Sequence, residues 1–183
     1  MRISAIEQHQ RIDRLEQKVF AEQQKVALLR DSVQSLQGPH EKRQRWLTRV
    51  LISETDRASE MVYVANVVRN RVVTAHNGED TYKGVILHPF AFSAFNPNSP
   101  LREYYMNLED HRRWDKAKRI ADAVLKARRP ELPLLVNVTH FYSPVSMKPR
   151  GRQPLWAKKK ERVNITTVDD KRFRFYGSSQ NVR

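Results

Sequence analysis

The feature that most limits the fold is a long segment without helix breakers. Residues 3–37 contain neither glycine nor proline and are rich in Glu, Gln, Lys and Arg, and Gly38-Pro39 ends the segment. Its apolar residues follow a heptad spacing, interrupted only at Gln8 and Glu22: Ala5, Ile12, Leu15, Val19, Val26, Leu29, Val33 and Leu36. Because heptad a and d positions form one seam, residues 1–38 are predicted to form a parallel coiled coil. The protein would then be a homo-oligomer through residues 5–36, either a dimer or a trimer. The alternative is a single amphipathic helix packed on the following domain.

Charge is distributed unevenly along the chain. Of the net charge of +14 carried by the 183 residues, nearly all lies after residue 42. Such a charge attracts polyanions, among them nucleic acid and an anionic cell wall, without choosing between them. The absence of cysteine excludes a disulfide framework and thiolate metal sites.

No stretch approaches the roughly 18 apolar residues of a membrane span. The first residues are too polar to supply the apolar core of a signal peptide. If the target lies outside the cytoplasm, we expect something else to carry the protein there.

Glu54 lies between two apolar helical patterns. The first predicted helix covers residues 41–54, and the second begins at an N-cap formed by Asp56 or Ser59 and ends near residues 76–78. The core-facing residues of the two helices are Trp46, Leu47, Val50 and Leu51, then Met61, Val64, Val67, Val68 and Val72. A carboxylate between two such helices is predicted to be held in place. The alternative is a helix-end glutamate on the surface.

The remaining patterns change from helix to strand along the chain. Residues 81–101 are predicted to be irregular or short-helical, with aromatic residues that line a groove, and residues 114–127 form an amphipathic helix. Residues 134–142 and 162–176 are β-branched and aromatic, and a turn is expected at Asp169-Asp170. Helices followed by a late β-hairpin indicate a mainly helical α+β domain over residues 43–183.

Several motifs follow Glu54 in a fixed order. They are Asn70-Arg71 at the end of the second helix, Gly84-Val85-Ile86, Phe92-Ser93, Thr139-His140-Phe141-Tyr142, Trp156 and the segment 172–176. Together they resemble the SleB/CwlJ cell wall hydrolase family over about residues 46–176. Around the glutamate the chain has Ser53-Glu54-Thr55, where the family usually has Gly-Glu-Ala.

This resemblance implies a lysozyme-like catalytic domain whose substrate is peptidoglycan. The expected reaction is cleavage between N-acetylmuramic acid and N-acetylglucosamine by a lytic transglycosylase, or alternatively by a muramidase. No cofactor is implied.

The chemistry of glycan cleavage assigns Glu54 a catalytic function independently. A glycosidic oxygen is a poor leaving group, so a carboxylic acid kept neutral by burial must protonate it. A hydrolase also needs a second carboxylate, and neither Asp56 nor Glu60 is a convincing partner. A lone glutamate favours a transglycosylase, in which the muramyl group supplies the internal nucleophile.

Seven further residues are candidates for substrate binding. Arg71 and Asn70 are expected to support the Glu54 region, Arg71 by a charge-assisted hydrogen bond and Asn70 by a bond to the backbone. Ser93, Thr139 and Tyr142 would bind sugar hydroxyl and N-acetyl groups. Phe92 would stack on a ring or pack in the core, and Trp156 completes the set.

Histidine chemistry is not expected to drive the reaction. No serine or cysteine nucleophile is paired with His140, and strand alternation places it opposite Thr139. The six histidines lack a zinc-amidase spacing, so no metal site is predicted.

Two other readings of the function remain open. The coiled coil and the basic domain also suit a nucleic-acid-binding or structural virion protein. A cell-wall-binding module without activity is the other. The stalk favours a phage particle as the location, with other virion or tail proteins as partners.

Overall fold

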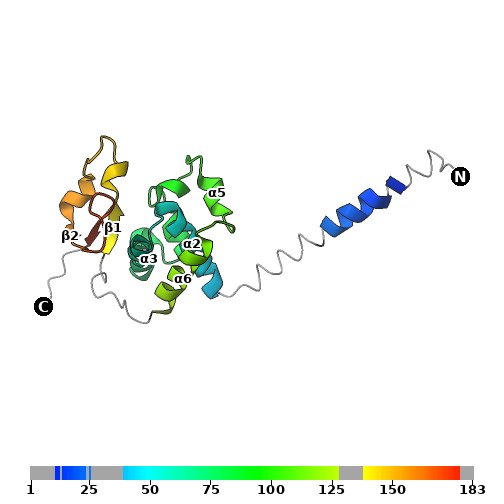
Figure 1. Ribbon diagram of the computed structural model, residues 1–183, viewed down its shortest axis with the longest axis horizontal. Coiled ribbons are helices and arrows are strands. Elements are labelled where there is room, and N and C mark those ends of the chain that lie inside the picture. The colour runs from blue at the N-terminus through cyan, green and yellow to red at the C-terminus, as the bar shows by residue number, and fades with distance from the viewer. Residues whose placement is uncertain (1–10, 13, 24, 26–38, 128–137, 178–183) are drawn as a thin grey trace. The chain divides into compact units, whose positions relative to one another are not determined.

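The computed structural model describes residues 11–12, 14–23, 25, 39–127 and 138–177. The chain divides into two compact units, Met1–Pro39 and His40–Arg183, which are described separately below. Figure 1 shows the second unit, in which helices α2 to α6 precede a small sheet along the chain. This arrangement is a mainly helical α+β fold, as the sequence predicts.

Two sixteen-residue helices flank the loop after Glu54. Helix α2 spans Pro39–Glu54 and helix α3 spans Ala58–Val73. Proline is tolerated at the start of α2 because the first helical N–H groups have no intrahelical partner. The predicted end at Glu54 is confirmed. The predicted N-caps of α3 are wrong: Arg57 is the N-cap, without a side-chain cap bond, and its backbone N–H donates to Thr55 Oγ1.

Helix α3 is buried on two faces. Met61, Val64 and Val68 lie in the main core with residues of α2, α4 and α6, whereas Tyr63 and Val67 pack against residues of the sheet and its loops. In Figure 1, α3 accordingly lies between the sheet and the helices α2 and α6. An apolar surface on several sides is typical of a central helix. Both faces of α3 are therefore held by tertiary contacts.

Short helices connect α3 to the last long helix. They are η1 (His76–Gly78), α4 (Tyr82–Leu87), η2 (Ser93–Phe95) and α5 (Arg102–Met106). The prediction of irregular and short-helical structure over residues 81–101 is thus confirmed. Helix α6 spans Trp114–Lys126, which agrees with the predicted amphipathic helix, and Arg69 donates to the carbonyls of Val124 and Ala127 at its end.

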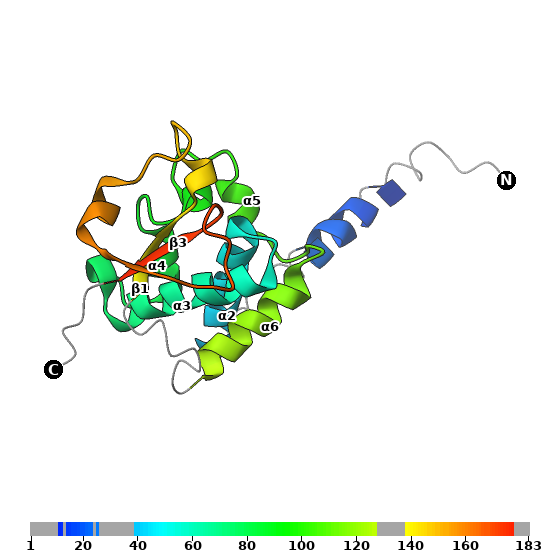
Figure 2. The same ribbon diagram turned by 60° about the vertical axis from the view of Figure 1, so that its left-hand side comes forward.

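The sheet has three antiparallel strands in the order β1-β3-β2. The strands are β1 (Val138–Tyr142), β2 (Glu161–Val163) and β3 (Arg174–Gly177). The connection from β1 to β2 contains η3 (Pro144–Ser146) and η4 (Leu155–Lys159). Figure 2 shows β1 and β3 side by side in front of α3. Residues 134–137 of the first predicted strand lie outside the described residues.

The predicted strand over residues 164–168 is wrong. The chain leaves the sheet after Val163, and a turn follows in which Asp169 O accepts from the N–H groups of Arg172 and Phe173. Ile165 and Val168 are buried in the apolar cluster between the sheet and α3. Their apolar character therefore serves core packing instead of strand pairing.

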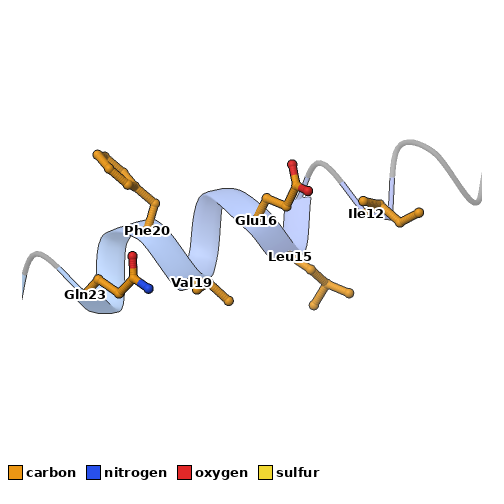
Figure 3. A pocket seen from close by; sticks show the side chains of 6 residues that line it. All are labelled: Ile12, Leu15, Glu16, Val19, Phe20 and Gln23. Atoms are coloured by element: carbon orange, nitrogen blue, oxygen red, sulfur yellow. The ribbon is translucent and has the colours of Figure 1, made fainter.

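In the N-terminal unit, the described residues between 11 and 25 are helical. Ile12, Leu15 and Val19 are 52%, 53% and 56% exposed. In Figure 3, Leu15 and Val19 point to one side of the helix while Glu16 and Phe20 point to the other. The other predicted seam residues, Ala5, Val26, Leu29, Val33 and Leu36, lie outside the described residues, so the coiled coil stays a prediction.

Candidate active site

Glu54 is the last residue of α2 and keeps part of its surface exposed. Arg113, which precedes α6, donates from Nη1 to the carbonyl of Thr55 at 2.9 Å and from Nη2 to that of Ile52 at 3.3 Å. These carbonyls lie on either side of Glu54 and have no helical partner of their own. The guanidinium thus holds the backbone that carries the candidate acid.

The surroundings of Glu54 favour its neutral form. Burial raises the pKa of Glu54 to about 7, although the positive charge of Arg71 opposes the shift. Burial likewise lowers the pKa of Arg71 to about 10, against the charge of Glu54. A carboxyl with a pKa near 7 is well suited to giving and taking a proton at neutral pH.

Asn70 and Arg71 connect the end of α3 to strand β1. Asn70 Nδ2 donates to the carbonyl of Val138 at 3.0 Å, and Arg71 Nε donates to that of Thr139 at 2.7 Å. No ion pair within 4 Å joins Arg71 to Glu54 in the described part of the chain. Arg71 therefore acts on Glu54 through its charge, while its direct bond goes to the backbone of β1.

Phe92 lies in the main core and is only 2% exposed. Its ring lies under Arg71, with Cζ of the guanidinium 5.2 Å from the ring centroid, and it also contacts Phe141. This burial does not support the prediction that Phe92 stacks on a sugar. The packing alternative agrees with the structure, in which the ring supports Arg71. Ser93, the next residue, is exposed at the start of η2.

The two carboxylates nearest to Glu54 in sequence are occupied by Arg172. Glu60 is buried and accepts from Arg172 Nε at 2.8 Å and Nη2 at 3.1 Å, as well as from the hydroxyl of Thr55. Asp56 is exposed and accepts from the same Nη2 at 3.1 Å. Glu60 therefore joins α3 to the segment before β3.

Thr139 and His140 are in contact, contrary to the predicted alternation. Thr139 Oγ1 lies 2.8 Å from His140 Nδ1. The pairing of β1 with β3 shifts register between Val138 and His140, and such an irregularity changes the direction of a side chain. The hydroxyl of Thr139 is thus engaged within the protein.

His140 lies between rings from two other elements. The ring centroid of Trp156 in η4 is 4.9 Å away and that of His76 in η1 is 5.1 Å away. Burial lowers the pKa of His140 to about 3, and the charges of Lys160 and Arg71 act in the same direction. The pKa of His76 is lowered by burial and by the same two cations.

Tyr142 and Trp156 belong to one aromatic cluster with Tyr176. Tyr142 is buried and its hydroxyl accepts from Arg174 Nη1 at 3.3 Å, whereas Trp156 keeps part of its surface exposed. Trp156 lies 5.9 Å from Tyr142 and 5.4 Å from Tyr176 between ring centroids. Trp156 is therefore the more accessible of the two side chains.

Sequence reasoning missed two residues near Glu54. One is Arg113, and the other is Tyr105 of α5. The pKa of Tyr105 is raised by burial, and the charge of Glu54 contributes, which places the hydroxyl within electrostatic range of the carboxyl. No local sequence pattern predicts that Arg113 or Tyr105 lies near Glu54, because both residues are about 50 or more positions away from it in the chain.

Neither a metal site nor a membrane-spanning helix is found within the described residues. No group of three or more His, Cys, Asp or Glu is placed there to hold a metal ion. None of the helices in that part of the chain has the length and apolar character to cross a membrane.

Comparison with known proteins identifies the family. Residues 55–174, more than half of the chain, match the family model described as cell wall hydrolase. The match begins at residue 55, directly after Glu54, so the candidate acid itself lies just outside the matched segment. Searches of curated proteins and of solved structures found no match. The chain belongs to the cell wall hydrolase family, whose members degrade peptidoglycan.

Proposed function

We propose that the protein is a lytic transglycosylase in which Glu54 is the only acid and base. The observation that carries this proposal is a carboxyl whose pKa is raised by burial to about 7 and on which Arg71 is the one charged group acting in the described structure. Asp56 and Glu60, the carboxylates closest in sequence, are bonded to Arg172. A hydrolase needs a second carboxylate to activate water or to form a covalent intermediate.

The proposed reaction uses the carboxyl of Glu54 twice, first as an acid and then as a base. The neutral carboxyl donates its proton to the oxygen that links muramic acid to glucosamine, and the bond from muramyl C1 to that oxygen breaks. The resulting carboxylate then accepts the proton of the muramyl C6 hydroxyl while O6 bonds to C1. The product is a 1,6-anhydro ring, no water is consumed, and Glu54 is neutral again.

Arg71 fits this cycle as a group that moderates the acid. Its charge lowers the pKa of Glu54 from the value that burial alone would give. It also stabilises the carboxylate that forms after the first proton transfer. Because Arg71 is fixed by Thr139 O and Phe92, its guanidinium needs little reorganisation during the reaction.

Product analysis tests the proposal. Purified peptidoglycan is digested with the wild type and with Glu54→Gln, and the muropeptides are read by mass spectrometry. We expect anhydro-muropeptides from the wild type and none from the variant. Reducing ends would indicate a muramidase and a water-activating group elsewhere, and no release by the wild type would favour a cell-wall-binding or nucleic-acid-binding module.

We further propose that the N-terminal unit is an oligomerisation stalk that fixes the enzyme in a phage particle. The exposed apolar side chains Ile12, Leu15 and Val19 follow the heptad spacing and support this proposal. Val19→Glu would place a charge in the seam, whereas Glu16→Gln changes the opposite side of the helix (Figure 3). Light scattering should show an oligomer for the wild type and Glu16→Gln and a monomer for Val19→Glu.

A monomeric wild type would refute the stalk. Location needs a separate measurement, because oligomerisation alone does not place the protein in a particle. Mass spectrometry of purified particles should detect the protein, and its presence only in lysates would contradict the assignment.

A further inference from the structure

Positively charged side chains lie near the corner between η1, β1 and η4, beside the partly exposed rings of His140 and Trp156. Lys160 follows η4 and precedes β2, and it is half-buried. No ion pair of Lys160 with a carboxylate is found within the described residues. Its charge acts on His76 and His140, so it lies within electrostatic range of both imidazoles.

Arg71 contributes a second cation to the same corner. Its Nε bonds to Thr139 O, but no hydrogen bond of Nη1 or Nη2 is found among the residues that the structure describes. Its charge also acts on both histidines. Lys160 and Arg71 thus share one region with the imidazoles of His76 and His140, whose neutral forms are favoured. No acidic side chain of the described residues is bonded to either cation.

A half-buried cation without a counterion is unfavourable, and an anionic ligand removes the penalty. The rings of His140 and Trp156 flank the same region, at a centroid distance of 4.9 Å. Aromatic faces suit the apolar side of a sugar ring, and Trp156 keeps part of its surface exposed. The corner therefore combines a surface for a sugar with a charge for an anion.

The chemistry of peptidoglycan narrows the identity of this anion. Where a stem peptide is attached, the lactyl carboxyl of the muramyl residue is part of an amide bond, so the sugars are neutral and the carboxylates belong to the peptide. A carboxylate that reaches a cation next to a bound sugar is therefore one from the stem peptide. The link from Arg71 to Glu54 places this corner next to the proposed reaction centre.

We propose that Trp156, His140 and Lys160 form a subsite for a peptide-bearing muramyl residue, in which Lys160 binds a carboxylate of the stem peptide. This proposal rests on the glycan-cleaving function proposed above. It predicts that the protein distinguishes glycan strands with peptides from strands without them.

The test compares two ligands and two lysine variants of the full chain. The ligands are glycan strands that carry their stem peptides, and the same strands after an amidase has removed the peptides and the lactyl carboxyl exposed on each muramyl residue has been converted to an amide. Lys160→Met removes the proposed carboxylate contact. Lys159→Met removes the same charge from an exposed neighbour in the same segment and is the matched control. Binding is measured by calorimetry with all proteins in the Glu54→Gln background, so that the ligands are not cut.

The affinity for peptide-bearing strands is divided by the affinity for peptide-free strands. We expect Lys160→Met to lower this ratio by about fivefold to tenfold. The control should change this ratio by less than about twofold, as an exposed charge contributes little. Equal losses with both ligands and both variants would indicate general attraction to a polyanion and would overturn the subsite.

The two proposals can fail separately. If the wild type releases anhydro-muropeptides but the Glu54→Gln protein with Lys160 intact binds both ligands equally well, the subsite is refuted and the transglycosylase remains. If neither ligand binds and the wild type releases nothing, both proposals fail.

Discussion

Replacing Glu54 by Gln should change stability in a pH-dependent way as well as abolish activity. Burial raises the pKa of Glu54 from 4.5 to about 7 in the folded protein, so the folded state binds this proton more tightly than the unfolded state. The wild type therefore loses stability as the pH rises from about 4.5 to about 7. The Glu54→Gln variant has no titrating group at this position, so its stability does not fall over this pH range for this reason.

The magnitude follows from the same pKa difference. One pKa unit corresponds to about 1.4 kcal/mol, which gives an upper value of about 3 kcal/mol above pH 7. Because Glu54 is partly exposed, we expect about 2 kcal/mol after solvent screening. For a domain of this size, that gain raises Tm by roughly 4 to 8 °C. Below pH 4.5 the variant and the wild type should unfold at nearly the same temperature.

The assay is thermal unfolding by circular dichroism between pH 4 and pH 8.5, alongside muropeptide release. Glu41→Gln is the control, because Glu41 is exposed in the first turn of the same helix and carries the same charge. It should change the free energy of unfolding by no more than about 0.5 kcal/mol. A Glu54→Gln effect on stability that is the same at pH 4 and pH 8.5 would refute the perturbed carboxyl and with it the proposed acid.

Two further substitutions test how the site is held. Arg113→Met should lower kcat about tenfold with little change in KM, because it releases the carbonyls of Ile52 and Thr55 on either side of the candidate acid. Arg112→Met should leave kcat unchanged, and an unchanged kcat in Arg113→Met would leave Arg113 with a structural function only. Arg172→Met should reduce the free energy of unfolding in urea by about 2 to 4 kcal/mol, because the buried carboxylate of Glu60 loses two hydrogen bonds. Lys171→Met is the matched surface control, and equal effects of the two would contradict the buried ion pair.

The local patterns predicted much of the fold. The end of α2 at Glu54 and the span of α6 follow from apolar periodicity and from residues that favour or end helices. The late strands β1 and β3 follow from their β-branched and aromatic residues. Where the prediction failed, at Ile165 and Val168, apolar residues were needed by the core and not by the sheet. Periodicity alone does not separate these two uses.

The candidate site likewise has one part that the sequence predicted and another that only the tertiary structure determined. The sequence by itself singled out Glu54, together with Asn70-Arg71, because their order along the chain is a local property that a motif can record. Only the tertiary structure decided which groups surround that carboxyl. Arg113 bonds a carbonyl 61 positions away, and Arg172 bonds Glu60 across 112 positions. Such contacts, and the burial that raises the pKa of Glu54, arise when distant segments pack together, and no local spacing encodes them.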